Sequence, residues 1–507
     1  MAVSMNETEI KYDAPPGATL PRLDDLPEVA SISRSAEEQL EADYYDTDDL
    51  RLIRAGITLR RRRRGGDDAG WHLKLPLGTS TRREIQLPPG RTGRSVPAEL
   101  AGLVRVHTRG KSLRPVARMT TRRQRLTLLD QAGGSLAEVM SDDVSAQTLG
   151  DTTALSSWRE IEVELTGGDQ GLLEAAADRL RCDGLRPAGR SAKLERALEG
   201  QLPESAHKVP LASSSSAGQV VLAYVQTQAE ALKSLDPMVR RDEPDAVHQM
   251  RVAIRRLRGA LRSFGKIISR DGTQRLAAEL KWLGTVLGEA RDGEVLAGHL
   301  LAGLEQTPGE LVIGPVQARV QGHFAPVRAA ARTKLLAALD SQRYFSLLDE
   351  LDKLVAEPAL TPKAAMPAAE VLPAAARRPY RQVRRRMRRA HDGPAGQSAD
   401  VALHQARKAA KRARYASEAM TPAIGRKARR FARQMKKVQS VLGDHHDTVI
   451  ARRAERELGI SAYLAGENAF SYGLLYERDA RDGEWLKAQA WQTWKRASRP
   501  RYQRWMH

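Results

Sequence analysis

Charged residues of both signs recur at every second position in several short segments of the first two hundred residues. One segment carries Glu7, Glu9 and Lys11, and another carries Glu160, Glu162 and Glu164. Because side chains alternate between the two faces of a strand, each set lies on one face. Carboxylate oxygens are ligands that Mg²⁺ and Mn²⁺ prefer. Within a shared enclosure, these segments would form a site for a divalent metal.

Basic residues lie at the same spacing in the segments between them. Arg60 and Arg62 share a face, Lys74 lies opposite Trp71 and Leu73, and Arg82 shares a face with Glu84. Guanidinium and ammonium groups bind phosphate oxygens, and arginine can do so with two hydrogen bonds. Carboxylates for a metal beside cations for phosphates are the equipment for phosphoryl transfer to water.

The elements that must position these residues are short and alternate between polar and apolar positions, as in an antiparallel sheet or barrel. The expected strands are 7–11, 57–64, 71–75, 82–87, 122–129 and 158–165, and the expected helices are 97–109 and 170–182. A sheet with one solvated face would show the same alternation. It would not explain why glutamates dominate the first and last strands while arginine and lysine dominate the strands between. A barrel with a polar interior is the alternative.

A histidine-led basic pattern occurs twice in the second half of the chain. The members of each copy share a helical stripe roughly 80° wide, and the second copy follows the first by 156 positions. The copies are His248, Arg251, Arg255 and Arg258, extended by Arg262, and then His404, Arg407, Lys411 and Arg414. No acidic residue interrupts either set, although like charges at this spacing repel. The repetition predicts a duplicated helical unit that binds a polyanion.

The charge balance points to the same half. The net charge of the 507 residues is +20. Residues 1–200 contribute −1 and residues 201–507 contribute +21. Aromatic residues make up only 5%, which suits a chain of phosphates better than stacked bases. The composition therefore disfavours nucleic acid as a partner. With Cys182 alone, no signal segment and no long apolar run, we expect a cytoplasmic protein with no membrane association.

The pattern predicts an α+β chain with an antiparallel first domain and an all-α second domain. We place the boundaries at 1–200 for the first domain, 201–218 for a linker and 219–500 for the helical domain, with repeats at 219–356 and 374–500.

Several motifs in order resemble known families. Glu7-x-Glu9-x-Lys11, Gly56-Ile57-Thr58-Leu59-Arg60-Arg61-Arg62, Trp71-His72-Leu73-Lys74 and Trp158 to Leu165 are similar to the CYTH family of triphosphate tunnel metalloenzymes. Val247-His248-x-Met250-Arg251 to Arg258, with Leu403-His404 to Arg414-Tyr415, resembles the CHAD helical domain. The chain thus resembles bacterial proteins that join the two domains.

The resemblance implies an eight-stranded antiparallel tunnel followed by helical units in pairs. It implies catalytic roles for Glu7, Glu9, Lys11, Glu160, Glu162 and Glu164, of which the five glutamates would hold Mg²⁺ or Mn²⁺. It implies triphosphate binding by Lys11, Arg60, Arg62, Lys74, Arg82, Lys193 and one of Arg122 and Arg123, of which strand parity favours Arg123. Asp143 would support the basic residues. His248 and His404 would lie at a groove that binds inorganic polyphosphate, whereas His445 and His446 are expected to be structural.

The leading hypothesis is metal-dependent hydrolysis of inorganic triphosphate, or of a triphosphate end, with polyphosphate bound by the helical domain. Such binding could place the protein on polyphosphate deposits in the cytoplasm. A non-catalytic polyphosphate scaffold or sensor is the alternative. Adenylate cyclase or thiamine triphosphatase activity is a further alternative. The sequence leaves the oligomeric state open.

Overall fold

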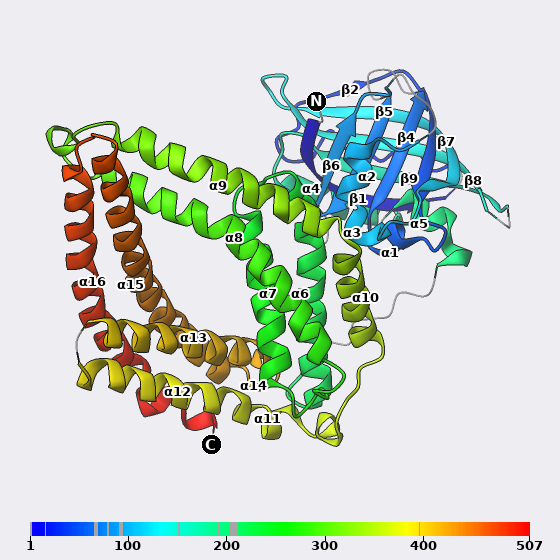
Figure 1. Ribbon diagram of the computed structural model, residues 1–507. Helices are drawn as coiled ribbons and strands as arrows, with labels where there is room; N and C mark the ends of the chain where they lie inside the picture. Colours follow the sequence, from blue (N-terminus) through cyan, green and yellow to red (C-terminus); the bar gives the residue numbers. More distant parts are fainter. Residues whose placement is uncertain are drawn as a thin grey trace. The chain divides into compact units, whose positions relative to one another are not determined.

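A computed structural model describes residues 3–15, 17–64, 69–78, 81–90, 95–150, 153–190, 192–202, 211–394 and 396–506. The chain divides into two compact units, Met1–His207 and Lys208–His507. The first unit is a β-barrel with short helices, and the second is entirely helical (Figure 1). The predicted linker at 201–218 lies partly outside the described residues, and helix α6 begins within it at Ala217.

Eight antiparallel strands close the barrel, in the order β1-β6-β5-β4-β3-β7-β8-β9 and back to β1. Their bounds are β1 Val3–Ala14, β3 Glu38–Asp46, β4 Thr58–Arg64, β5 Gly70–Pro76, β6 Thr81–Leu87, β7 Arg114–Leu129, β8 Ser135–Thr148 and β9 Leu155–Leu165. Two short strands, β2 (Ser31–Arg34) and β10 (Arg186–Pro187), pair with β7 and β1. The predicted fold class is confirmed, although β7 is longer than expected and the sequence pattern had not indicated β3 or β8.

The apolar positions of the strands face outward and are covered by helices. Helix α4 (Gln170–Cys182) packs against Leu128, Val139 and Val163. On another side, α2 (Ala98–Leu103) and the residues around it cover Trp71 and Leu73. A short helix, α3 (Arg105–Thr108), follows. Since the apolar side of each strand is buried outside the barrel, the charged side must face its interior.

One end of the barrel is filled with apolar side chains. Helix α5 (Lys193–Ala197) contributes Leu194, which joins Tyr44, Met119 and Val144 in one buried cluster. Helix α1 (Arg51–Arg54) contributes to the same cluster. Lys193 begins α5 and is therefore fixed beside the barrel interior. A 3₁₀ turn, η2 (Glu199–Gln201), follows.

The second unit consists of long helices in antiparallel pairs (Figure 1). The first set is α6 Ala217–Arg240, α7 Ala246–Ser263, α8 Gln274–Glu305, α9 Val316–Leu339 and α10 Gln342–Ala356. The second set is α11 Ala368–Val371, α12 Pro373–Asp392, α13 Gln397–Ala419, α14 Thr421–Ile424, α15 Arg426–Leu464 and α16 Phe470–Ala497. Short 3₁₀ turns lie at η3 Gly309–Leu311, η4 Pro362–Ala365, η5 Pro500–Tyr502 and η6 Arg504–Met506.

The duplicated motif places its two copies on corresponding helices, α7 and α13. In α7, Met250, Ile254 and Leu257 are fully buried, so the basic stripe occupies the opposite side of the helix. Ser216 caps α6 through a capping box with Gln219, which explains why the serine-rich segment ends in a helix. Across the described residues, no helix has the length and hydropathy that a membrane span requires.

Candidate functional site

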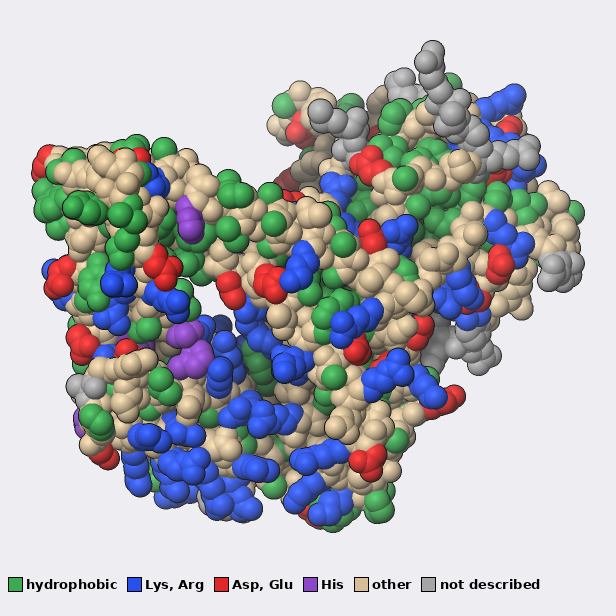
Figure 2. Space-filling view, in the orientation of Figure 1, with side chains coloured by type: hydrophobic (Ala, Val, Ile, Leu, Met, Phe, Trp, Pro, Cys, Tyr) green, Lys and Arg blue, Asp and Glu red, His purple; other side chains and the backbone are tan. Residues whose placement is uncertain are grey.

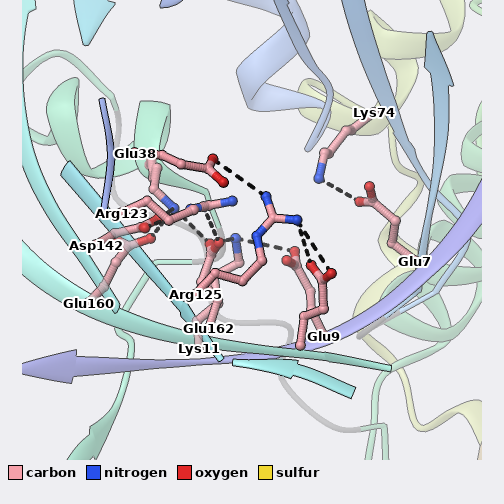
Figure 3. Close-up of polar contacts among 12 residues, drawn as sticks. Glu7, Glu9, Lys11, Glu38, Lys74, Arg123, Arg125, Asp142, Glu160 and Glu162 are labelled. Carbon is pink, nitrogen blue, oxygen red and sulfur yellow. Dashed lines mark hydrogen bonds and ion pairs between the residues drawn. The ribbon is translucent and has the colours of Figure 1, made fainter. Parts of the chain in front are cut away.

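The interior of the barrel holds buried side chains of both charges. The exposed fractions of Glu7, Glu9, Glu160 and Glu162 are between 4% and 8%, and Arg123 is 8% exposed. These side chains come from different strands and point toward one another (Figure 3). A solvated sheet face would leave such groups in water, so the barrel alternative accounts for the alternation.

Lys11 joins the first and last strands. The register places Lys11 beside Glu162 and Glu9 beside Glu164 across the β1–β9 pair. The Lys11 ammonium pairs with Glu162 and lies 3.2 Å from Glu9. Burial alone would raise the pKa of Glu9, but the charge of Lys11 lowers it below the ordinary value. Burial likewise opposes ionisation of Glu162, but the charges of Lys11, Lys193 and Arg123 bring its pKa well below the usual range.

A compact carboxylate group surrounds the end of Lys193. Oxygens of Asp142, Glu160 and Glu162 lie within 4.8 Å of one another, and the Lys193 ammonium lies 2.9, 2.6 and 2.8 Å from them. Arg123 donates to both oxygens of Asp142, at 2.8 and 2.6 Å, and approaches Glu162 at 3.2 Å. The pKa of Lys193 is well above its ordinary value because these carboxylates outweigh its burial.

Asp142 was not predicted from the sequence, and the expected role of Asp143 was wrong. Asp142 is fully buried inside the barrel, whereas the side chain of Asp143 is 49% exposed. Within the described part of the chain, the ion pairs of Asp143 are with Arg122 and Arg159, each at 3.8 Å, and not with the buried cations. Side chains alternate between the two faces of β8. Asp142 pairs in register with Glu160 and shares its inner face, so Asp143 faces the other way.

A second group of contacts links β1, β5 and β6. Lys74 donates to Glu7 at 2.5 Å, and His72 lies 2.8 Å from Glu84. Arg60 lies 3.8 Å from the same Glu84 carboxylate. Burial, a hydrogen bond with Glu84 and nearby carboxylates raise the pKa of Glu7 to about 8. Burial and the neighbouring arginines lower the pKa of His72 to about 4, so its imidazole is neutral. His72 and Glu84 were not among the predicted site residues.

The remaining predicted cations lie on the same inner face. Arg62 is 4% exposed, and burial with Arg60 nearby lowers its pKa to about 9. Arg82 is partly exposed and acts electrostatically on Glu9. Arg125, also missed from the sequence, lies 3.7 Å from Glu38 (Figure 3) and 3.2 Å from Glu138.

The donor set fits a divalent metal. Three buried carboxylates in one small volume are hard oxygen ligands of the kind that Mg²⁺ and Mn²⁺ take. Glu160 and Glu162 of the predicted ligands belong to this group together with Asp142. Glu9 is joined to it through Lys11, while Glu7 and Glu164 are not part of it.

The helical unit contains a cavity of about 2270 Å³. Sixteen lysine and arginine residues line it against four acidic residues. Figure 2 shows this hollow between α7 and α13, with blue side chains gathered around it and histidines at its edge. Of the predicted polyphosphate-binding residues, it brings together His248, Arg251, Arg255, Arg258, Arg262, His404, Arg407 and Lys411.

Arg414 is the exception. It does not line the cavity, because its guanidinium donates to Glu418 at 2.7 Å and to Gln439 at 3.0 Å. Glu418 lies one turn beyond Arg414 on the same side of α13, so the basic stripe ends in this ion pair. Its counterpart in the first copy, Arg258, lines the cavity.

The two copies also share a contact between helices. Arg251 lies across Gly288 of α8, 3.3 Å from where a Cβ would be, and donates to Asp292 at 2.6 Å. Arg407 lies across Gly443 of α15 at 3.6 Å. The glycine of each repeat leaves room for an arginine side chain on the neighbouring helix.

The histidines divide between the cavity and the core. The rings of His404 and His446 are 4.1 Å apart, and both line the cavity. Burial, His404 and Arg407 lower the pKa of His446 to about 4. His445 is buried and lies 3.3 Å from Asp400. The structural interpretation therefore suits the position of His445 and not that of His446.

Comparison with protein families divides the chain at the same point as its fold. The model of the CYTH domain matches residues 5–193, and that of the CHAD domain matches residues 223–455. The chain is a CYTH–CHAD protein. Two uncharacterized proteins, from two strains of Mycobacterium tuberculosis, are each 38% identical over 488 residues, covering 94% of this chain and 93% of theirs. The predicted families are thereby confirmed.

Solved structures resemble parts of this CYTH–CHAD protein. PptA from Streptomyces chartreusis aligns with a TM-score of 0.48 and 20% identity, over 55% of this chain and 100% of that one. The CHAD domain from the plant Ricinus communis aligns with a TM-score of 0.42 and 25% identity, over 61% of this chain and 97% of that one.

Proposed function

We propose that the barrel hydrolyses inorganic triphosphate, or the triphosphate end of a larger molecule, with Mg²⁺ or Mn²⁺. CYTH domains are tunnel metalloenzymes that act on triphosphates. The observation that carries the proposal for this chain is the buried network in which Asp142, Glu160 and Glu162 meet Lys193, Arg123 and Lys11. Acidic and basic groups are both needed there, because a metal–triphosphate complex carries both charges.

In this proposal the cations hold the phosphates and the carboxylates hold the metal. Arg60, Arg62 and Arg123 would donate to phosphate oxygens, with Lys11, Lys74, Arg82 and Lys193 adding positive charge from other strands. Glu9, Glu160, Glu162 and Asp142 supply oxygen ligands, and Glu7 and Glu164 complete the acidic face. A bound divalent metal would neutralise phosphate charge as the bond to the leaving phosphate breaks.

The test is phosphate release from tripolyphosphate by the purified protein. Glu9→Gln removes one buried carboxylate with little change in volume, so activity at saturating metal should fall by about 10²-fold or more. Glu37→Gln alters an exposed carboxylate between β2 and β3 and is the matched control. Full activity in Glu9→Gln would contradict the assignment. A panel with ATP and thiamine triphosphate separates the cyclase and thiamine triphosphatase alternatives.

We further propose that the cavity of the helical unit binds inorganic polyphosphate. CHAD domains are associated with polyphosphate. The charge excess of the cavity lining supports this binding, and neutral histidines can donate hydrogen bonds to phosphate. The alternative, a non-catalytic polyphosphate scaffold or sensor, would combine this cavity with an inactive barrel. The presence of the buried carboxylate group favours the enzyme.

A further inference from the structure

Three segments of the helical unit are rich in cations and contain no acidic residue. Residues 371–391 carry eight arginines, 419–443 carry seven arginines and lysines, and 485–507 carry six. They belong to α12, to the first half of α15, and to the end of α16 with the residues after it. The third segment lies beyond residue 455, where the match to the CHAD family ends.

Aromatic rings, three of them buried and one partly buried, pack the three segments together. Tyr380 of α12 lies 5.6 Å from Phe431 of α15 and 5.7 Å from Trp494 of α16. Phe431 lies 5.9 Å from Trp505 in η6. Cations from distant parts of the sequence are therefore fixed around one small core and are not free to separate.

The first half of α15 carries a basic stripe opposite this core. Arg426, Arg430, Arg433 and Lys437 are exposed, and their spacing places them within roughly 60° of the helix circumference. Among the described residues, no carboxylate forms an ion pair with any of the four. Like charges at this spacing repel by about 0.2–0.5 kcal/mol per pair, which an anionic ligand would offset.

A hollow of about 410 Å³ lies along this stripe. Its lining is Arg430, Arg433, Gln434, Lys437, Arg501 and Tyr502. Side chains from two turns of α15 thus lie beside hydrogen-bond donors from η5. Every side chain that lines the hollow can donate a hydrogen bond. We call this hollow with Arg426 the α15–η5 surface. None of its residues lines the central cavity.

We propose that the α15–η5 surface is a second binding site for condensed phosphate chains, so that one long chain occupies both it and the cavity. The inference rests on the polyphosphate binding proposed above. Helix α12 borders both regions, because Arg377, Arg378 and Arg381 line the cavity and Tyr380 packs against α15. Exposed Arg384 and Arg388 add positive charge on the same helix.

The chemistry favours a chain of phosphates over a nucleic acid. Binding of single strands draws on exposed aromatic rings that stack with bases. Here Tyr380, Phe431 and Trp494 are buried, and Tyr502 is the one aromatic residue among those lining the hollow. Arginine and lysine with no stacking platform match a backbone of phosphates alone.

A two-site arrangement makes affinity depend on chain length. The cavity lining has a positive excess of twelve, so a chain of about a dozen singly charged phosphates neutralises it. A chain several times longer can reach the second surface, and its second contact is intramolecular. Long chains should therefore bind at least about tenfold more tightly than short ones at equal phosphate concentration.

The experiment measures binding of short polyphosphate, long polyphosphate and duplex DNA to the full-length protein. The test variant is Arg430→Glu, Arg433→Glu and Lys437→Glu together. The control is Lys281→Glu, Lys353→Glu and Arg456→Glu, which makes the same charge change at exposed positions outside both sites. A cavity variant, Arg255→Glu with Arg407→Glu, reports on the proposed function itself. Circular dichroism verifies folding of each.

The test variant should bind short chains within about twofold of the wild type and lose the tenfold gain for long chains. The control should keep that gain. Equal long-chain affinity in the test variant and the control would overturn the second site while leaving the cavity in place. A larger loss for duplex DNA than for polyphosphate would reassign the surface to nucleic acid. Failure of the wild type to bind short chains would instead refute the proposed function.

Discussion

Asp142 and Asp143 are neighbours in the sequence but meet opposite environments. Asp142 accepts from Arg123 and pairs with Lys193 inside the barrel, whereas Asp143 is half exposed. Alternation indicated the inner face of β1 and β9 because, from Glu7 to Lys11 and from Glu160 to Leu165, apolar residues occupy the opposite face alone. It failed for β8, where Leu136 and Met140 are buried on one parity and Val139 on the other.

This pair offers a matched comparison for the buried network. Asp142→Asn should abolish most triphosphatase activity and lower the free energy of unfolding by about 3–5 kcal/mol, because Lys193 and Arg123 lose a buried counter-charge. Asp143→Asn should keep activity and change stability by less than about 0.5 kcal/mol. Phosphate release and urea denaturation of both variants give the answer, and equal behaviour of the two would place the catalytic carboxylates elsewhere.

Lys411 provides a pH-dependent signature of anion binding. Burial, Arg407 and Arg255 lower its pKa to about 7 in the cavity. A bound phosphate chain would raise that pKa, so the complex takes up a proton when the pH is above about 7. Affinity is then highest below pH 7 and falls by up to about tenfold per unit as the pH rises toward the pKa of the complex.

Lys411→Arg holds the charge fixed and should flatten this pH dependence between about 7 and 9. Calorimetry in buffers of different ionisation enthalpy measures the proton uptake directly. An unchanged slope in Lys411→Arg would assign the titration to another group.

At the scale of elements, α5 closes one end of the barrel and positions Lys193. Leu194 is 1% exposed among Tyr44, Met119 and Val144. The sequence did not predict this role, because a five-residue helix has too few turns to show a periodicity and β3, which it covers, is buried along most of its length. The long helices α7 and α13 were predictable, since their apolar and basic sides repeat over several turns.

Leu194→Ala should therefore destabilise the barrel. The expected loss is about 2–5 kcal/mol of unfolding free energy, the range for a buried leucine that leaves a cavity. Leu155→Ala, at a side chain that is 80% exposed at the start of β9, should change stability by less than about 0.5 kcal/mol. Thermal unfolding of the two variants compares them, and similar melting temperatures would mean that α5 is not part of the barrel core.

At the scale of the whole molecule, charge divides as the fold does. The barrel unit is nearly neutral and folds its charges inward, whereas the helical unit holds the positive excess and exposes it around a cavity. The division was predictable from the running charge and the 156-residue displacement. The second basic surface was not, because its arginines come from three segments that only the tertiary packing brings together.

Polyphosphate binding in the cavity and catalysis in the barrel should be separable by mutation. Arg251, Arg255, Arg407 and Lys411 all line the cavity and lie on sides of α7 and α13 that are not fully buried. Replacing all four by glutamate reverses the charge of each stripe at its centre, so binding of long polyphosphate should fall by about 10³-fold or more. The residues of the buried carboxylate and cation network belong to the first unit, so tripolyphosphate turnover should stay within a few-fold. Binding and kinetics measured on the same folded variant decide this, with circular dichroism as the control. If turnover collapsed together with binding while the helices remained folded, catalysis would depend on both units, and the division of labour between barrel and cavity would have to be abandoned.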